Sequence, residues 1–230
     1  MKNVSKRGIF LVSIFLICTI AVLWRRFGAS ITKNPEQQSV RDSLYQQKRV
    51  LLYNTKVYSK AVRLADNGDI VVRLGADLTS ELLRNMNGKD RTYSHAGIIC
   101  REHDTVFVYH ALGGEFNPDQ QLLREPLWTF GHPGGNKKLA LYRIRMDSNA
   151  SRKLTTIIQQ VYQQRIPFDT AFSLATQNRL YCTEFVALCF EKALQDTTLF
   201  HRSTAGDKRY IGVDDLTGSK QARKVESWAY

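Results

Sequence analysis

Two histidines and one cysteine have the residue types that thiol chemistry requires. His95 lies in the apolar run YSHAGII, His110 ends the apolar run VFVYH, and Cys182 opens the segment CTEFVALCF. A thiolate beside an imidazole is a nucleophile for acyl transfer. The imidazole takes the thiol proton and later gives a proton to the leaving group. These residues therefore predict chemistry at an amide or ester carbonyl, provided that the fold brings them together.

A β-hairpin is the element that must bring the two histidines together. One strand-like run begins at His95, another ends just after His110, and the polar tripeptide EHD separates them. Pairing Glu102 with Thr105 across a two-residue loop places His95 diagonal to His110 on one face, where such neighbours are about 7 Å apart. An odd loop length would send the two side chains to opposite faces. A lone strand histidine is usually a half-buried packing residue, so this register is what favours a functional pair.

A helix is predicted to begin at Cys182, because apolar residues follow it at positions i+3, i+4, i+7 and i+8. They are Phe185, Val186, Cys189, Phe190, Ala193 and Leu194. In the first turn of a helix, unpaired N–H groups and the positive end of the dipole favour a thiolate. The alternative is that Cys182 is a small core residue, as most cysteines on an apolar helix face are.

The other cysteines and the metal-ligand spacings indicate no second site. Cys100 on the first hairpin strand and Cys189 on the helix are assigned to the core. A disulfide between them stays open for an oxidising compartment, because connectivity cannot be read from sequence. No C-x-x-C or H-E-x-x-H spacing occurs. We therefore predict neither a metal nor a cofactor.

Further elements follow from periodicity and turn signals. A helix is expected from residue 44 to about 65, with Asn67-Gly68 ending it. Strands are expected at residues 69–74 and 139–145, with a short helix around 78–83. The Gly- and Pro-rich stretch at 128–135 is predicted to be a loop that borders the substrate cleft or plays no role.

The N-terminus carries a segment of membrane type. Residues 8–24 are 17 residues without a charge, which is the lower limit for a helix that spans a bilayer. Cleavage of a signal peptide after Gly28-Ala29-Ser30 is the alternative, but the pair Arg25-Arg26 favours a retained anchor. We therefore expect a basic flank, an anchor, a linker and a catalytic domain. Their ranges are 1–7, 8–26, 27–43 and 44–230.

The chain is basic, with a formal net charge of +12. Beyond residue 26 it holds 28 basic and 21 acidic residues, so an anionic partner such as a phospholipid headgroup or a cell-wall polymer is favoured. The basic residues lack the runs and aromatic interleaving of a nucleic-acid reader. We predict a solvated face near an anionic membrane surface and no nucleic-acid partner.

The motifs NGDIVVR, YSHAGII, VFVYHA, PFDTAF and RLYCTEFV occur in this order between residues 66 and 216. In order and spacing they resemble the circularly permuted papain-like cysteine hydrolases of the NlpC superfamily, specifically the YiiX/YebB-like group. The resemblance implies an α+β fold with an antiparallel sheet packed on helices, which follows the N-terminal transmembrane helix. It also implies a histidine, then a polar residue, then a cysteine as the chain order of the catalytic groups.

The resemblance implies a role for each candidate. Cys182 is the nucleophile, His95 the general base, and His110 the third residue, which holds the His95 ring in the required tautomer. Glutamate is frequent at that third place in this group, so a histidine there removes a negative charge. Tyr93 is a candidate oxyanion or substrate contact, although a strand-edge tyrosine more often packs. Asp169 in PFDTAF is assigned to a turn.

The substrate is not determined by these motifs. We expect a membrane-anchored thiol hydrolase of amide or ester bonds, with cell-wall peptide as the first substrate and lipid acyl bonds as the alternative. A third hypothesis is a catalytically silent binding module on the same fold. The expected location is the bacterial inner membrane, crossed once, with the catalytic domain outside the cytoplasm. The sequence does not predict the oligomeric state.

Overall fold

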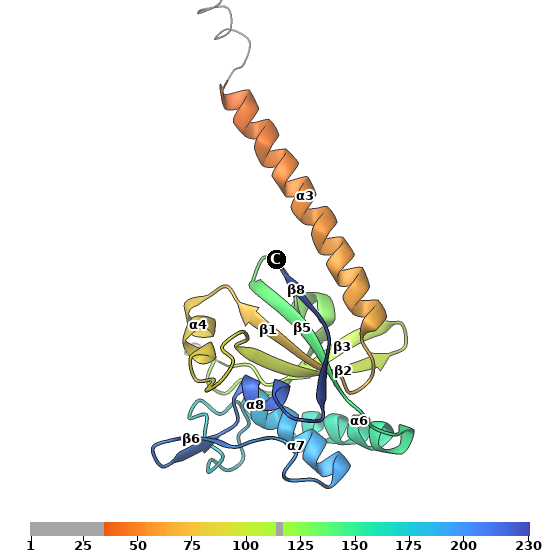
Figure 1. The fold of residues 1–230 in the computed structure, drawn as a ribbon, viewed down its shortest axis with the longest axis vertical. Coiled ribbons are helices and arrows are strands. Elements are labelled where there is room, and N and C mark those ends of the chain that lie inside the picture. The colour runs from red at the N-terminus through yellow and green to blue at the C-terminus, as the bar shows by residue number, and fades with distance from the viewer. Residues whose placement is uncertain (1–34, 114–116) are drawn as a thin grey trace, which may run out of the picture. The chain divides into compact units, whose positions relative to one another are not determined.

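The computed structural model describes residues 35–113 and 117–230, and the chain divides into two compact units, residues 1–53 and 54–230. The elements in chain order are α3 (Pro35–Leu64), β1 (Ile70–Gly75), α4 (Leu78–Arg84), β2 (His95–Glu102), β3 (Thr105–His110), β4 (Leu123–Pro126), α5 (Leu127–Phe130), β5 (Asn136–Ile144), α6 (Ser148–Gln163), α7 (Cys182–Leu194), β6 (Ser203–Ala205), β7 (Lys208–Tyr210), α8 (Val213–Thr217) and β8 (Ala222–Ala229) (Figure 1).

The first described helix, α3, begins earlier than its hydrophobic pattern indicated. It starts at Pro35, a residue whose fixed φ suits the first helical position, so residues 35–43 of the expected linker are helical. The expected anchor at residues 8–26 lies outside the described residues. Within the part of the chain that the structure describes, no helix combines the length and hydropathy needed to span a bilayer.

A six-stranded antiparallel sheet is the centre of the second unit. Its strand order is β4-β3-β2-β1-β5-β8. In the β2–β3 hairpin, Glu102 pairs with Thr105 and Ile98 with Tyr109. This is the predicted two-residue loop and the predicted register. The hairpin therefore carries His95 and His110 on the same face of the sheet.

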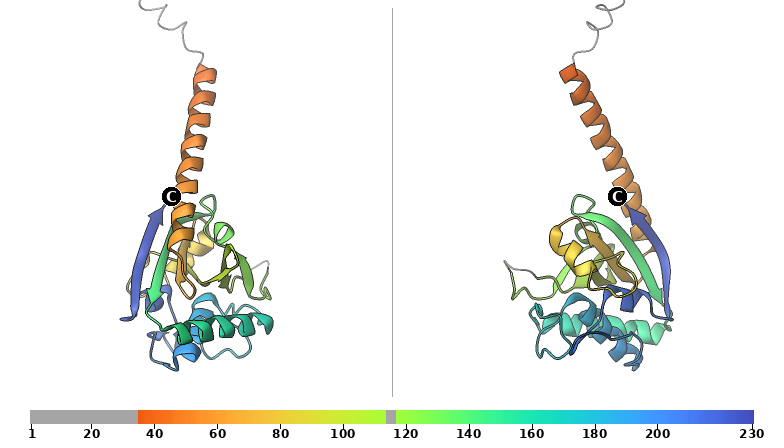
Figure 2. Two further views of the ribbon diagram at one scale, coloured as in Figure 1. Left: turned by 90° about the vertical axis from the view of Figure 1, so that its right-hand side faces the viewer. Right: turned by 60° about the vertical axis from the view of Figure 1, so that its left-hand side comes forward.

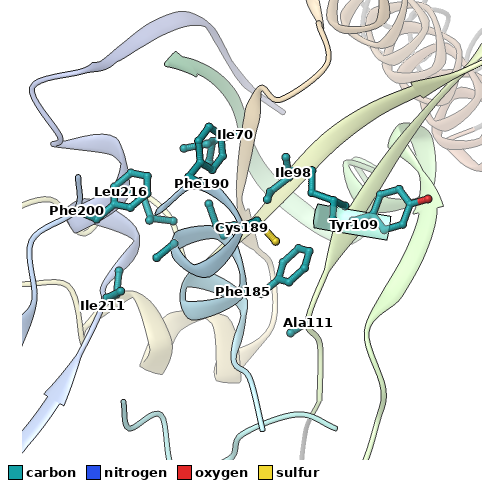
Figure 3. Packing of buried hydrophobic residues seen from close by; sticks show 14 of the residues in the cluster. Ile70, Ile98, Tyr109, Ala111, Phe185, Cys189, Phe190, Phe200, Ile211 and Leu216 are labelled. Atoms are coloured by element: carbon teal, nitrogen blue, oxygen red, sulfur yellow. The ribbon is translucent and has the colours of Figure 1, made fainter. Parts of the chain in front are cut away.

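Alternating side chains divide the core between the two faces of the sheet. One face carries Ile70, Ile98 and Tyr109, which pack with residues of α6, α7 and α8. Figure 3 shows this cluster gathered around α7, with Phe185 and Phe190 at its centre. The opposite face carries Val71, Ile99 and Val108, which pack with the last turns of α3 and with α5. The two histidines share the parity of the second face.

Helices α6 and α7 lie side by side against the sheet (Figure 2). Helix α6 was not predicted, although Asp147 caps its N-terminus by accepting a hydrogen bond from the Ala150 N–H. The predicted loop at residues 128–135 contains most of the short helix α5. The expected α+β architecture, an antiparallel sheet packed on helices, is confirmed.

Candidate active site

The two histidines form a hydrogen-bonded pair. Nε2 of His95 lies 2.9 Å from Nδ1 of His110. His110 also reaches the neighbouring strand β4, where its Nε2 lies 3.1 Å from Oε1 of Glu125. The result is a continuous row of three polar side chains from β2, β3 and β4. The diagonal placement expected from the hairpin register is therefore found, with a glutamate added to it.

The hydrogen bonds of the row determine which ring nitrogens carry a hydrogen. A carboxylate oxygen only accepts hydrogen bonds, so Nε2 of His110 carries a hydrogen and donates it to Glu125. In neutral His110, Nδ1 is then an acceptor, and Nε2 of His95 donates to it. Nδ1 of neutral His95 is left without a hydrogen. The second nitrogen of His95 is therefore a free base.

Burial keeps both imidazoles uncharged. His95 is 6 % exposed and His110 is fully buried. Burial lowers the pKa of His95 well below its usual value, and the charges of Arg73 and His110 act in the same direction. Burial also lowers the pKa of His110, while the hydrogen bond and charge of Glu125 oppose this and Arg73 adds to it. Both rings are therefore neutral at physiological pH, which is the state from which the hydrogen positions in the row were derived.

Phe130 of α5 is the apolar wall of the histidine pair. Its ring centroid lies 5.6 Å from that of His95 and 5.1 Å from that of His110. The Phe130 side chain is fully buried. The ring thus fixes both imidazoles from the side and excludes water from them. Part of the stretch predicted as a loop is therefore a helix that supports the histidines.

Cys182 begins α7 at the place that the periodicity predicted. Its thiol is buried, and the backbone N–H groups of Ala96, Thr183 and Cys182 are near enough to lower the pKa of the thiol. Ala96 follows His95 directly in β2. The sulfur therefore lies beside the start of the strand that carries His95.

The resting state of Cys182 differs from the expected thiolate. Burial raises the pKa of the Cys182 thiol, and this outweighs the three N–H groups and the charge of Arg73, all of which lower it. The helix N-terminus supplies the predicted stabilisation, but desolvation of the charged form is larger. Cys182 and His95 accordingly rest as a neutral thiol and a neutral imidazole.

Arg73 of β1 brings a positive charge to the same region. It is the cross-strand partner of His95. Its Nη1 donates a hydrogen bond of 2.7 Å to the carbonyl oxygen of Phe130, and its guanidinium carbon lies 4.6 Å from the centre of the Phe130 ring. Its charge acts on Cys182 and on both histidines. The positive charge is fixed in place by contacts to one residue.

A narrow pocket opens beside Cys182. Its free volume is about 30 Å³, which is enough for one or two water molecules. Its walls come from α4 and the residues after it, from α7 and the segment before it, and from β7 and the start of α8. Its larger side chains are Leu83, Met86, Phe172, Tyr181, Tyr210, Ile211 and Val213. Only short uncharged polar groups, such as Ser94 and Thr183, interrupt this apolar lining. The pocket beside the thiol therefore suits an apolar group.

Tyr93 and Asp169, which were also singled out in the sequence, lie in a packed cluster and in a turn. Tyr93 is buried in the apolar cluster, where its ring packs edge to face on Tyr142 at 6.4 Å. Burial raises the pKa of Tyr93 to about 12, with a smaller contribution from Tyr142. The carboxylate of Asp169 accepts hydrogen bonds from the N–H groups of Ala171 and Ser173, so its predicted role in a turn is confirmed. Cys100 and Cys189 are buried and have free thiols.

Three residues of the site were not found from the sequence. Glu125 was missed because the segment between β3 and β4 gives no pairing signal, so the neighbour of His110 was undetermined. Arg73 lies in the predicted strand at residues 69–74, and the strand parity that places it opposite His95 needs the β1–β2 pairing. Phe130 was visible only as an aromatic residue in a Gly- and Pro-rich stretch.

A metal site is not formed by the described side chains. Within residues 35–113 and 117–230, no group of three or more His, Cys, Asp or Glu residues is arranged to hold a metal ion. The polar groups of the site are a thiol and imidazoles, which are the nucleophile and the base that thiol chemistry uses.

Comparisons with known proteins show the family and the fold of the chain. The family model described as permuted papain-like amidase enzyme, YaeF/YiiX, C92 family, matches residues 65–220. A solved structure, described as that of metalloprotein yiiX from Escherichia coli O157:H7, superposes with a TM-score of 0.60 at 16 % sequence identity. The superposition covers 73 % of this chain and 99 % of the other. No curated protein matches the chain.

The structural likeness shows a shared fold, and the family match covers more than half of the chain and contains all the residues of the hydrogen-bonded row, Arg73 and Cys182. The predicted resemblance to the YiiX group of permuted papain-like enzymes is confirmed. The chain therefore belongs to the permuted papain-like amidase family YaeF/YiiX, C92, and is an enzyme of the papain-like cysteine hydrolase class.

Proposed function

We propose that the protein cleaves an amide bond through a covalent thioester at Cys182, with His95 as general base and acid. The observation that carries this proposal is the hydrogen-bonded row of His95, His110 and Glu125. Because Nε2 of His95 is occupied by His110, the bare Nδ1 is the nitrogen that remains for the thiol proton. The row thus leaves one ring nitrogen of His95 as a base, and Ala96, the next residue in β2, acts on the Cys182 thiol through its backbone N–H.

The reaction has two halves, formation of the thioester and its hydrolysis. The Cys182 sulfur attacks the carbonyl carbon while its proton passes to Nδ1 of His95, and His95 then gives this proton to the leaving amine as the carbon–nitrogen bond breaks. Water next gives a proton to His95 as it attacks the thioester, and His95 returns the proton to the departing sulfur. A neutral resting pair fits this sequence, because the proton is transferred during attack.

Two groups of the site offset part of the cost of burying the charged species that form. The imidazolium of His95 is adjacent to His110, whose far nitrogen is hydrogen-bonded to Glu125. This carboxylate supplies the negative charge that the histidine at the third position lacks. The N–H of Cys182 at the start of α7 is a donor for the oxyanion of the tetrahedral intermediate.

Cell-wall peptide is our first candidate substrate, on the basis of the N-terminal apolar segment and the basic surface. That segment would anchor the enzyme in the bacterial inner membrane, with the catalytic domain outside the cytoplasm. A lipid acyl bond is the second candidate, because the pocket beside Cys182 is lined by apolar and aromatic side chains. An acyl chain would place methylene groups against this lining.

Thiol alkylation of the full-length chain tests the catalytic pair first. Iodoacetamide should modify Cys182 at a rate that falls at least about tenfold in His95→Ala, and Cys182→Ala should remove the signal. Cys189→Ala is the matched control, because it removes a buried thiol of the same helix without touching the row. If Cys182 reacts equally fast with and without His95, the pair is not catalytic and the silent binding module replaces this proposal.

Substrate competition then separates the two candidates. Cell-wall stem peptides and N-acyl amides of increasing chain length are incubated with the enzyme, and product formation is compared with that of Cys182→Ala. Peptide hydrolysis without dependence on an apolar group supports the first candidate. Turnover that rises with acyl chain length supports the second and excludes the first.

A further inference from the structure

Arg73 has an unusual environment for a cation. Its guanidinium is partly buried between β1 and α5, where it contacts the carbonyl oxygen and the ring face of Phe130. Among the described residues, no carboxylate lies within ion-pair distance of it. A buried charge without a close counter-ion costs stability. Its place in this sheet is therefore not explained by a gain in stability from an ion pair.

The groups around Arg73 are those of the active site. Across the ladder it faces His95, and the Phe130 ring that it covers also contacts both histidines. The titratable and charged groups within its electrostatic reach come from five neighbouring elements. They are His95 of β2, His110 of β3, Glu125 of β4, Cys182 of α7, and Asp77, which caps α4.

We propose that Arg73 is a positioning residue for the thiol reaction: held by Phe130, its guanidinium keeps a fixed positive charge near Cys182 and His95, and this charge stabilises the negative charge that develops on the sulfur as its proton passes to His95. This inference rests on the proposed function, because it assigns a role within the same site. The negative charge that forms on the sulfur during attack is the counter-charge that Arg73 lacks at rest.

The sign of the effect distinguishes this role from a structural one. A positive charge lowers the pKa of the Cys182 thiol and that of the His95 imidazole. Removing the charge while keeping the burial should therefore raise both values. Loosening of the site would instead admit water, which lowers the pKa of the buried thiol and raises that of the buried imidazole. The thiol shift has opposite signs in the two cases.

The experiment uses the full-length chain with Arg73→Gln, Arg73→Lys and the control Arg223→Gln, which removes an exposed arginine from β8. The pH midpoint of Cys182 alkylation is measured with iodoacetamide, after subtraction of the rate in Cys182→Ala. The ring resonances of His95 are titrated by NMR in the same samples. We expect Arg73→Gln to move the thiol midpoint upward by about one pH unit and the His95 midpoint upward as well. Arg73→Lys should restore most of both shifts, and Arg223→Gln should change neither.

Two results would overturn the inference. An unchanged thiol midpoint in Arg73→Gln would show that its charge does not act on the sulfur, and a downward shift would show a structural role. Failure of the proposed function has a separate signature in the same assay, because Cys182 alkylation in the wild type would then be independent of His95. Thermal melts of each variant establish that the compared proteins are folded.

Discussion

Nε2 of His95 lies 2.9 Å from Nδ1 of His110, although the residues are 15 positions apart in the chain. A two-residue loop in the β2–β3 hairpin fixes the register that makes this contact. This contact involves one nitrogen of each ring. The other nitrogen of His110, Nε2, is hydrogen-bonded to Glu125, and Nδ1 of His95 is left as a base. The pairing of three adjacent strands therefore determines which ring nitrogens take part in hydrogen bonds.

Replacing Glu125 with glutamine should slow the thiol reaction without unfolding the protein. Its carboxylate raises the pKa of His110 against the effect of burial, so the amide weakens the stabilisation of an imidazolium in the row. We expect Cys182 alkylation to slow by about tenfold, which is the lower end for an outer partner of a catalytic histidine. Glu102→Gln is the control, because Glu102 pairs with Arg124 at the far end of the same hairpin. Equal slowing in both variants would assign the effect to the hairpin as a whole.

Gly97 allows the close approach of β2 and β3 at the histidines. A Cβ at this position would lie 2.6 Å from Cγ1 of Val108 and 3.1 Å from Cβ of His110. Gly97→Ala should therefore displace β3, cost about 1–3 kcal/mol of unfolding free energy, and slow Cys182 alkylation. Gly135→Ala is the control, since the nearest atom to its added Cβ is 4.0 Å away. Urea unfolding and alkylation rates check both variants, and a Gly97→Ala protein with wild-type rates would contradict the role of this packing.

Phe130 should affect the histidines beyond its contribution to stability. Phe130→Ala and Phe200→Ala each remove a phenyl ring that is at most 1 % exposed, and each should cost about 3–5 kcal/mol. Only Phe130 contacts the histidine rings, so only its loss should admit water to them and raise their pKa values. NMR titration of the imidazoles measures this under conditions where both variants are folded. The same histidine shift in Phe200→Ala would point to a general loosening of the domain.

Glu184 should make stability depend on pH. Burial raises the pKa of Glu184 to about 8. The Tyr181 N–H lowers this pKa by a smaller amount, and the charge of Asp169 raises it. Between the unfolded value and about 8, the folded state binds the proton more tightly, so this residue lowers the unfolding free energy as pH rises. Glu184→Gln should abolish that loss and stabilise the protein at pH 9 by roughly 2 kcal/mol.

Chemical denaturation from pH 5 to 9 gives the difference between wild type and Glu184→Gln. The difference should grow with pH and then level off above about 8. Glu81→Gln, in the first turn of α4, is the control, because the Glu81 side chain is 38 % exposed and paired with Arg84 and Lys137, and it should give a difference that is constant across this range. A flat curve for Glu184→Gln would show that its carboxyl is not desolvated in the folded protein.

Local patterns in the sequence determined the elements that carry the chemistry. Alternation and the EHD tripeptide gave the hairpin and its register, and the spacing of apolar residues after Cys182 gave the first residue of α7. Both signals involve residues that are near one another in the chain, where loop length and helical period leave few alternatives. The candidate residues Cys182, His95 and His110, and the family resemblance, followed from these patterns and from the order of the motifs.

Only the tertiary structure decided the surroundings of those residues. Glu125, Arg73 and Phe130 come to the histidines from three separate elements, through strand pairing and packing that no local pattern specifies. The charge state of Cys182 also depended on the fold. A helix N-terminus can be read from sequence, but the depth of burial, which raises the pKa of the thiol, is a property of everything packed around it. Local rules thus identify the reacting groups, whereas desolvation and long-range pairing set their protonation states.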